Sequence, residues 1–338
     1  MNKGKFFIFI LLMTTVLLAA ATLGLIVGQY PIQVEDLASV WSTQDSTAKL
    51  VILELRLPRI ICSIFIGALL AVTGSCMQGI FRNPLVEPSF IGISAGAASA
   101  VVLFLVVLKP ILIQYIPLNE FVVPCVAFVG SVVTVKIVIN LASIQGRISI
   151  GALLLSGIAV NAFCGALMGI CIYFADDAQL RSITFWNLGS LASISWQEVY
   201  ILTPIFIGGL LYLFLLRFKL DIASLGEDQA ISLGVDMQSL TRRVVYSTCL
   251  IVGATVAFAG IIGFVGLLVP HITRFLVGAN YKFLLIGSAL IGSVVLLSSD
   301  IAARSFLDGA ELPLGAITAL LGAPFFIYQI SKMRKEII

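Results

Sequence analysis

Residues 57–81 read LPRIICSIFIGALLAVTGSCMQGIF, and Arg59 is the only charged residue among them. A helix needs about 20 consecutive apolar residues to cross a bilayer. Stretches of similar character recur along the chain, at residues 6–27, 89–108, 121–140, 151–174, 198–216, 244–262, 263–277, 283–303 and 312–330. They carry closely spaced Gly, Ala and Ser rather than the strict alternation of a membrane barrel strand. The sequence therefore predicts an all-α polytopic membrane bundle of about ten transmembrane helices.

Composition supports this interpretation. The 338 residues are 60% hydrophobic and 11% charged, whereas soluble domains carry about 25% charged residues. About ten spans use nearly the whole chain, so we expect residues 1–338 to form a single transmembrane domain without a soluble catalytic domain. The formal net charge of +3 is too small and too scattered to favour nucleic acid as a partner.

Cysteine and histidine usage argues against a metal or redox site. The six cysteines show no C-x-x-C spacing and lie in apolar stretches, where packing is their expected role. His271 is the only histidine and has no nearby Cys or carboxylate at ligand spacing. We expect no catalytic residues, no metal ligands and no cofactor.

The first apolar stretch has two interpretations. Lys3 and Lys5 precede it and Ala19, Ala20 and Ala21 lie within it, as in a secretory signal with a small-residue cleavage site. A signal core spans only about 7–15 residues, whereas residues 6–27 continue further. We predict an uncleaved first span.

Basic residues predict the orientation, because Lys and Arg are retained on the cytoplasmic side. With the amino terminus inside, 14 of the 20 basic residues lie inside: Lys3, Lys5, Arg82, Lys136, Arg147, Arg217, Lys219, Arg242, Arg243, Arg274, Lys282, Lys332, Arg334 and Lys335. Both termini are therefore predicted to be cytoplasmic. The parity requires two crossings within residues 244–277, one of them a short or broken helix, and Gly260, Gly263, Gly266 and Pro270 supply the breakers.

A pattern G-A-x-x-A-x-x-G occurs at Gly67–Gly74 and again at Gly253–Gly260. An inverted repeat, as in many transporters, or chance similarity between two Gly/Ala-rich helices would each explain it. Gly157, Asn161, Gly165 and Gly169 also recur every four residues, so they share one helix face. Such a face marks either close packing or a transport pathway.

The longest polar segment, residues 217–243, reads RFKLDIASLGEDQAISLGVDMQSLTRR. Glycines at Gly226 and Gly234 predict two short helices joined by a turn. The segment otherwise faces water but contains the apolar residues Leu225, Ala230, Ile231, Leu233 and Val235. They favour a docking surface for a cytoplasmic partner over a bland surface loop.

Several motifs carry a resemblance that covers the chain from about residue 50 to its end. They are RLPR at 56–59, GALLAVTG at 67–74, MQGIFRNPLVEP at 77–88, GISAGA at 92–97, SLG at 224–226, GFVGLLVPHITR at 263–274, SDIAAR at 299–304 and ELPLGAITALLGAPFFI at 311–327. Together they resemble the FecCD-type permeases of ABC importers for iron-siderophores, haem and cobalamin. The resemblance implies the type II importer permease fold in a bacterial cytoplasmic (inner) membrane.

The same resemblance implies four kinds of partner: a second permease subunit, identical or not, two cytoplasmic ATPases, an extracytoplasmic substrate-binding protein, and the lipid bilayer. The sequence has no G-x-x-x-x-G-K-[ST] loop, so ATP hydrolysis is expected on the partner. The alternative is a stand-alone channel or secondary carrier. A ferric siderophore is the first expected substrate, haem the second and cobalamin the third, on family frequency alone.

Residue roles follow from the resemblance by position. Arg56, Arg59 and Arg304 would receive glutamates of the binding protein, although Arg59 could instead cap its helix or pair internally with Glu54. The ATPase-coupling residues would be Leu225, Gly226, Glu227, Asp228, Ala230, Leu233 and Gly234. The cytoplasmic gate would comprise Asn83, Pro84, Leu85, Ile150 and Gly151, where Ile150 and Gly151 depart from the small hydroxyl residues common in the family. Met77, Gln78, Asn161, Gly165 and Met168 would lie near the pathway, with packing as the alternative.

Overall fold

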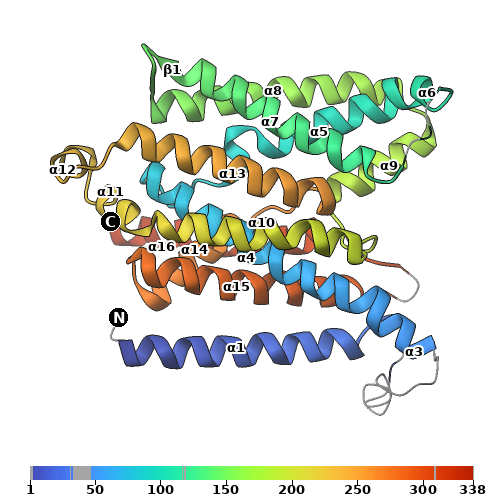
Figure 1. Cartoon of the computed structure of the whole chain (residues 1–338), viewed down its shortest axis with the longest axis horizontal. Coiled ribbons are helices and arrows are strands. Elements are labelled where there is room, and N and C mark those ends of the chain that lie inside the picture. The colour runs from blue at the N-terminus through green and yellow to red at the C-terminus, as the bar shows by residue number, and fades with distance from the viewer. Residues whose placement is uncertain are drawn as a thin grey trace. The chain divides into compact units, whose positions relative to one another are not determined.

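The structure is a computed structural model that describes residues 3–30, 32, 47–115, 117, 119–307 and 310–337. Within these ranges, eight helices are long and apolar enough to cross a membrane, and two apolar helices are shorter. The long helices centre on α1 (Lys3–Ile26), α4 (Leu57–Phe81), α5 (Ile93–Leu103), α7 (Val122–Ala142), α8 (Ile150–Tyr173), α10 (Trp196–Leu215), α13 (Met237–Ala259) and α15 (Tyr281–Ala303). The shorter ones are α14 (Val265–Val277) and the apolar part of α16 (Leu314–Ile337). The predicted helical membrane fold is confirmed (Figure 1).

The helices group into two compact units. Unit 1 comprises Met1–Ser75, Ser190–Leu210 and Ile262–Ile338, and unit 2 comprises Cys76–Gly189 and Leu211–Ile261. The unit boundaries fall inside α4 and α10, so each of these helices contributes to both units.

In unit 1, α15 packs against α1, α14 and α16. Two glycines of α4 bring backbones into direct contact: a Cβ on Gly67 would overlap the backbone of Gly292 in α15, and a Cβ on Gly74 would overlap the backbone of Gly266 in α14. Small residues permit this close approach between membrane helices. The first copy of the repeated glycine pattern is therefore a packing surface.

In unit 2, α5 packs against α7 and α8, and α7 packs against α13. A Cβ on Gly96 would overlap the side chain of Thr134, so the small residues of α5 serve close packing as well. A helix outside the predicted spans, α9 (Asp177–Leu188), begins with a capping box formed by Asp176 and Gln179. Within this unit, α12 (Glu227–Ser232) lies at one end, and α6 (Lys109–Leu112) and α9 lie at the other (Figure 1).

The predicted break within residues 244–277 is confirmed. Helix α13 ends at Ala259, and α14 starts only at Val265. Gly260 has φ +69°, and a Cβ there would overlap the carbonyl oxygen of Trp186. Glycine is required at this position both for its backbone conformation and for the space.

Two features differ from the sequence-based expectation. The helix expected over 57–81 starts at Thr47 and runs through a π-helical turn, Val51–Arg56, so Arg56 and Arg59 lie in one continuous helix. A small antiparallel hairpin of β1 (Ser143–Ile144) and β2 (Arg147–Ile148) joins α7 to α8. Its turn residues, Gln145 and Gly146, have φ of 51° and 78°, the positive values that a two-residue hairpin turn with matching twist requires.

Candidate functional site

The polar segment forms the two short helices that its glycines predict, α11 (Arg217–Ala223) and α12 (Glu227–Ser232). Gly226 precedes α12 with φ +124°, and Gly234 follows it with φ +79°. Open space surrounds both positions, so the backbone conformation rather than steric fit requires glycine. The segment is thus a defined structural element.

The apolar side chains of this segment divide into two groups. Ala230 and Val235 are buried, and Val235 N–H donates to the Ala230 carbonyl at 2.9 Å. Leu225, Ile231 and Leu233 are 56%, 58% and 60% exposed. Ala230 therefore packs α12 onto the unit, whereas the three larger residues form an exposed apolar surface, called here the α12 surface. Glu227 and Asp228, from the first turn of α12, are also exposed.

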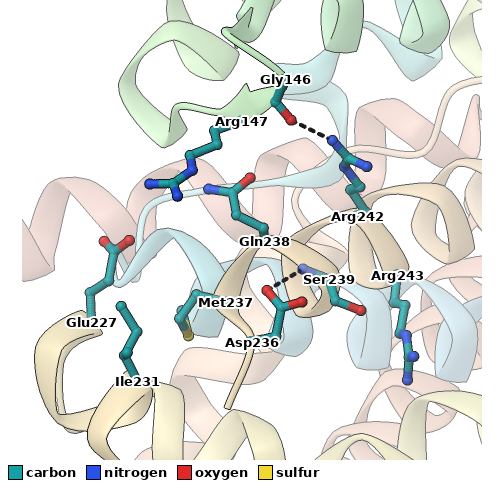
Figure 2. Close-up of a pocket in the computed structure, with 10 residues that line it drawn as sticks. All are labelled: Gly146, Arg147, Glu227, Ile231, Asp236, Met237, Gln238, Ser239, Arg242 and Arg243. Atoms are coloured by element: carbon teal, nitrogen blue, oxygen red, sulfur yellow. Dashed lines mark hydrogen bonds between the residues drawn. The ribbon is translucent and has the colours of Figure 1, made fainter. Parts of the chain in front are cut away.

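A pocket of about 560 Å³ lies beside α12 (Figure 2). Its lining residues are Gly146, Arg147, Glu227, Ile231, Asp236, Met237, Gln238, Ser239, Arg242 and Arg243. Arg242 Nη2 donates to the Gly146 carbonyl at 2.6 Å, and Asp236 caps α13 by accepting from Ser239 N–H at 3.1 Å. The pocket thus connects α12, the hairpin and the first turns of α13.

The two predicted gate segments approach this end of unit 2. Asn83 Oδ1 accepts from Leu85 N–H at 2.9 Å and holds the turn after α4. Ile150 and Gly151 begin α8, whose cap is Ser149. A second pocket, of about 590 Å³, is lined by Ile150, Gly151, Arg82 and Glu227 together with Phe81, Ile148, Ser149, Met237, Gln238 and Thr241. It therefore joins the end of α4, the start of α8 and α12, although Asn83, Pro84 and Leu85 do not line it.

One ion pair links these elements. Arg82 Nη2 lies 3.4 Å from Glu227 Oε2, and both side chains are well exposed to solvent. Exposed pairs contribute only ~0–1 kcal/mol. The pair therefore contributes little to holding α12 in place.

The five residues predicted near the pathway do not share one surface. Met77 and Gln78 are buried within α4. Asn161 donates through Nδ2 to the Ser89 carbonyl at 3.3 Å, and its buried Oδ1 has no hydrogen-bond partner among the described residues. Gly165 is exposed on α8 and Met168 is half-buried, with open space beside Gly165. The α8 residues therefore remain candidates for a pathway, whereas Met77 and Gln78 pack inside the unit.

The three predicted docking arginines lie in unit 1, and all three are buried. Arg59 forms ion pairs with Asp300 at 2.8 Å and with Glu311 at 2.9 Å. The Asp300 side chain is fully buried, whereas the Glu311 side chain is 30% exposed. The internal partners of Arg59 are therefore these two acids rather than Glu54.

Arg56 and Arg304 hold the end of α1. Arg56 donates to the carbonyls of Leu25, Ile26 and Tyr30, and Arg304 donates to the Gly24 carbonyl at 2.7 Å. The last carbonyls of a helix have no partner within that helix, so the two arginines complete the end of α1. Burial lowers the pKa of Arg304 below its ordinary value, and the neighbouring Asp300 carboxylate offsets only part of this lowering. We call Arg56, Arg59, Arg304, Asp300 and Glu311 the arginine cluster.

Sequence reasoning did not find the two acids as partners of Arg59. Both lie in motifs quoted above, SDIAAR and ELPLG, yet they are 241 and 252 residues away from Arg59 along the chain. A buried charge needs a partner of opposite charge. The position of Arg59 inside an apolar span therefore already indicated that an acidic partner had to lie elsewhere in the chain. Gln238 and Arg242, which bond the hairpin, carried no signal in the sequence.

Comparison with known proteins extends these observations. The FecCD transport family model matches residues 15–332. The chain is 38% identical over 302 residues to the hemin transport system permease protein HmuU of Yersinia pestis, covering 88% of each protein. It is also 38% identical over 323 residues to the vitamin B12 import system permease protein BtuC of Vibrio vulnificus, covering 95% of this chain and 93% of the relative.

A solved structure gives the same result for the fold. It is described as an inward-facing conformation of a metal-chelate type ABC transporter, and it matches with a TM-score of 0.83 at 34% identity. The match covers 95% of this chain and 97% of that chain. The helical arrangement, the family match over almost the entire sequence and these relatives agree, and the protein belongs to the FecCD transport family of ABC importer permeases.

Proposed function

We propose that this permease subunit pairs with a second permease subunit to form the pathway for a metal chelate. A ferric siderophore is our first candidate, ahead of haem and cobalamin. The relatives named for hemin and vitamin B12 support this class, because both compounds hold a metal within a large organic ligand. The α8 face that carries Gly165 and Met168 supports a wide pathway with few polar contacts.

The observation that carries the proposal is the α12 surface. Leu225, Ile231 and Leu233 are exposed on a segment that turns at two glycines with positive φ and is anchored by buried Ala230. Exposed apolar side chains on an ordered polar segment are typical of a protein interface. We assign this surface to a cytoplasmic ATPase. The distribution of Lys and Arg supports, independently, two cytoplasmic termini.

Binding-protein docking at the arginine cluster is the second part of the proposal. The cluster contains three arginines and two carboxylates, and therefore has one formal positive charge in excess. Glu311 is the more exposed of the two acids, so a carboxylate of the binding protein would approach Arg59 from that side. Arginine suits such an exchange because its guanidinium binds carboxylates through two parallel hydrogen bonds.

Reconstitution tests the function. The permease, co-purified with its ATPase and supplied with the binding protein, is placed in proteoliposomes, and ATP-dependent uptake of labelled ferric siderophores, haem and cobalamin is compared. We expect one chelate class to be taken up. Deletion of Leu225–Val235 should remove both ATPase co-purification and uptake. Uptake that persists without any ATPase would instead identify a stand-alone channel or secondary carrier.

A further inference from the structure

One glutamine joins α13 to the connection that leads into α8. Gln238 is the second residue of α13, and its Oε1 accepts from the Ile148 N–H at 2.7 Å. Its Nε2 donates to the Ile148 carbonyl at 3.1 Å. A side-chain amide carries both a donor and an acceptor, so this one residue satisfies both backbone groups of the buried Ile148.

Arg242 forms a second link one helical turn later. Its Nη2 donates to the carbonyl of Gly146 in the hairpin turn. Residues four apart lie on the same face of a helix, so Gln238 and Arg242 present adjacent groups toward the hairpin. Figure 2 shows both side chains extending from α13 toward the hairpin. The hairpin is thus bonded to α13 at its turn and at its last residue.

These links stand between the α12 surface and the start of α8. On one side, residues 233–236 connect α12 to α13, and Asp236 caps α13. On the other side, Ile148 is followed at once by Ser149, the cap of α8, and by Ile150 and Gly151. A displacement of the first turn of α13 therefore reaches the start of α8 through Gln238.

We propose that Gln238 is a positioning residue that makes the start of α8 follow the first turn of α13, with Arg242 as a supporting contact. The inference rests on the function proposed above and adds the residue that transmits movement from α12 to the gate segment. Without Gln238, the N–H and carbonyl of Ile148 lose their hydrogen-bond partner. This loss weakens the attachment of the hairpin to α13. Residues 148–151 then no longer follow α13 when α12 moves.

The test is the number of chelate molecules taken up per ATP hydrolysed by the complete complex in proteoliposomes. Gln238→Leu removes both bonds at similar side-chain size, and we expect the ratio to fall about tenfold while ATPase co-purification and ATP hydrolysis persist. Gln238→Glu keeps the acceptor for Ile148 N–H and loses the donor, so we expect a fall of about threefold. Gln197→Leu, at an exposed position at the start of α10, is the matched control and should leave the ratio unchanged.

Several outcomes would overturn the inference. An unchanged ratio in an assembled Gln238→Leu complex contradicts it. If that variant does not assemble, an assembled Gln238→Glu complex with a normal ratio contradicts it equally, because Gln238 would then only support folding. Failure of the proposed function is distinct: the complex with the unmodified chain would then show no ATP-dependent uptake of any chelate, and the inference would fall with it.

Discussion

The arginine cluster of unit 1 and the Arg82–Glu227 ion pair of unit 2 use the same residue type for different purposes. In the cluster, Arg59 contacts two carboxylates at 2.8–2.9 Å and is buried. Beside α12, Arg82 reaches Glu227 at 3.4 Å in an exposed pair. Water screens an exposed pair, whereas a buried charge that loses its partner remains desolvated. The comparison teaches that burial makes arginine a structural link in unit 1, whereas exposure makes the arginine pair of unit 2 a weak contact.

Breaking the buried side of this comparison should produce the largest effect. Asp300→Asn removes the fully buried negative charge that pairs with Arg59 and lies beside Arg304. We expect a loss of about 3–5 kcal/mol in the free energy of unfolding, because buried Arg304 loses its neighbouring carboxylate and Arg59 loses one of its two. Unfolding in mixed micelles measures this loss. Asp228→Asn on exposed α12 is the control, and equal stability of the two variants would contradict the assigned role of burial.

An intermediate effect is expected at Glu311, which is 30% exposed. Glu311→Gln should cost about 1–2 kcal/mol of stability, since water partly replaces the lost carboxylate. It also weakens the bidentate contact of Arg59 Nη1 and Nη2 with residue 311, so affinity for the binding protein should rise. Titration of the binding protein onto the complex in nanodiscs measures this affinity. Weaker or unchanged binding would contradict the proposal that Arg59 contacts the binding protein.

Buried Ala230 and exposed Leu233 offer a contrast within one short segment. Leu233→Ala removes a side chain that is 60% exposed, so we expect a change in stability below about 0.5 kcal/mol. ATPase binding should nevertheless weaken by about tenfold, the size of effect that a single apolar interface residue can produce. Ala230→Leu, at a fully buried position, should instead lower stability, because the packed site has no room for the larger side chain. If Leu233→Ala lowered stability and Ala230→Leu weakened only ATPase binding, α12 would bury the opposite face.

The smallest effect is expected for the exposed pair. Arg82→Gln should change the free energy of unfolding by less than about 1 kcal/mol, and the difference should shrink further as salt concentration rises. Unfolding at low and high ionic strength checks this. A loss comparable to that of Asp300→Asn would mean that Arg82 is a structural link after all.

Most of the fold could be predicted from hydropathy because each span is predominantly apolar. The extension of the helix from Leu57 back to Thr47 could not, because Lys49, Glu54 and Arg56 make this stretch read as a polar loop. The hairpin was missed for a related reason. Its turn uses Gln145–Gly146 rather than Asn-Gly, the strongest short-range hairpin signal.

The candidate site was predictable only in part. Gly226 and Gly234 mark the two short helices in the sequence itself, since a turn with positive φ favours glycine. The burial of Ala230 beside exposed Leu233 depends on packing between elements, which the order of residues does not reveal. The pairing of Arg59 with Asp300 joins residues 241 positions apart, so it too required the folded structure.

The contacts of α1 have a consequence for the order of synthesis. This helix packs on α15, with the rings of Phe6 and Phe283 4.4 Å apart, and its end is bonded by Arg304, 280 residues away from Gly24. Ribosomes add roughly 5–20 residues per second, so α1 reaches the lipid on the order of tens of seconds before α15 is made. Only 11% of its most apolar window is buried in the finished fold, and its hydropathy, 2.5, is the highest of the long helices. In the nascent chain, α1 is therefore apolar enough to remain in the lipid without a packing partner until α15 is translated.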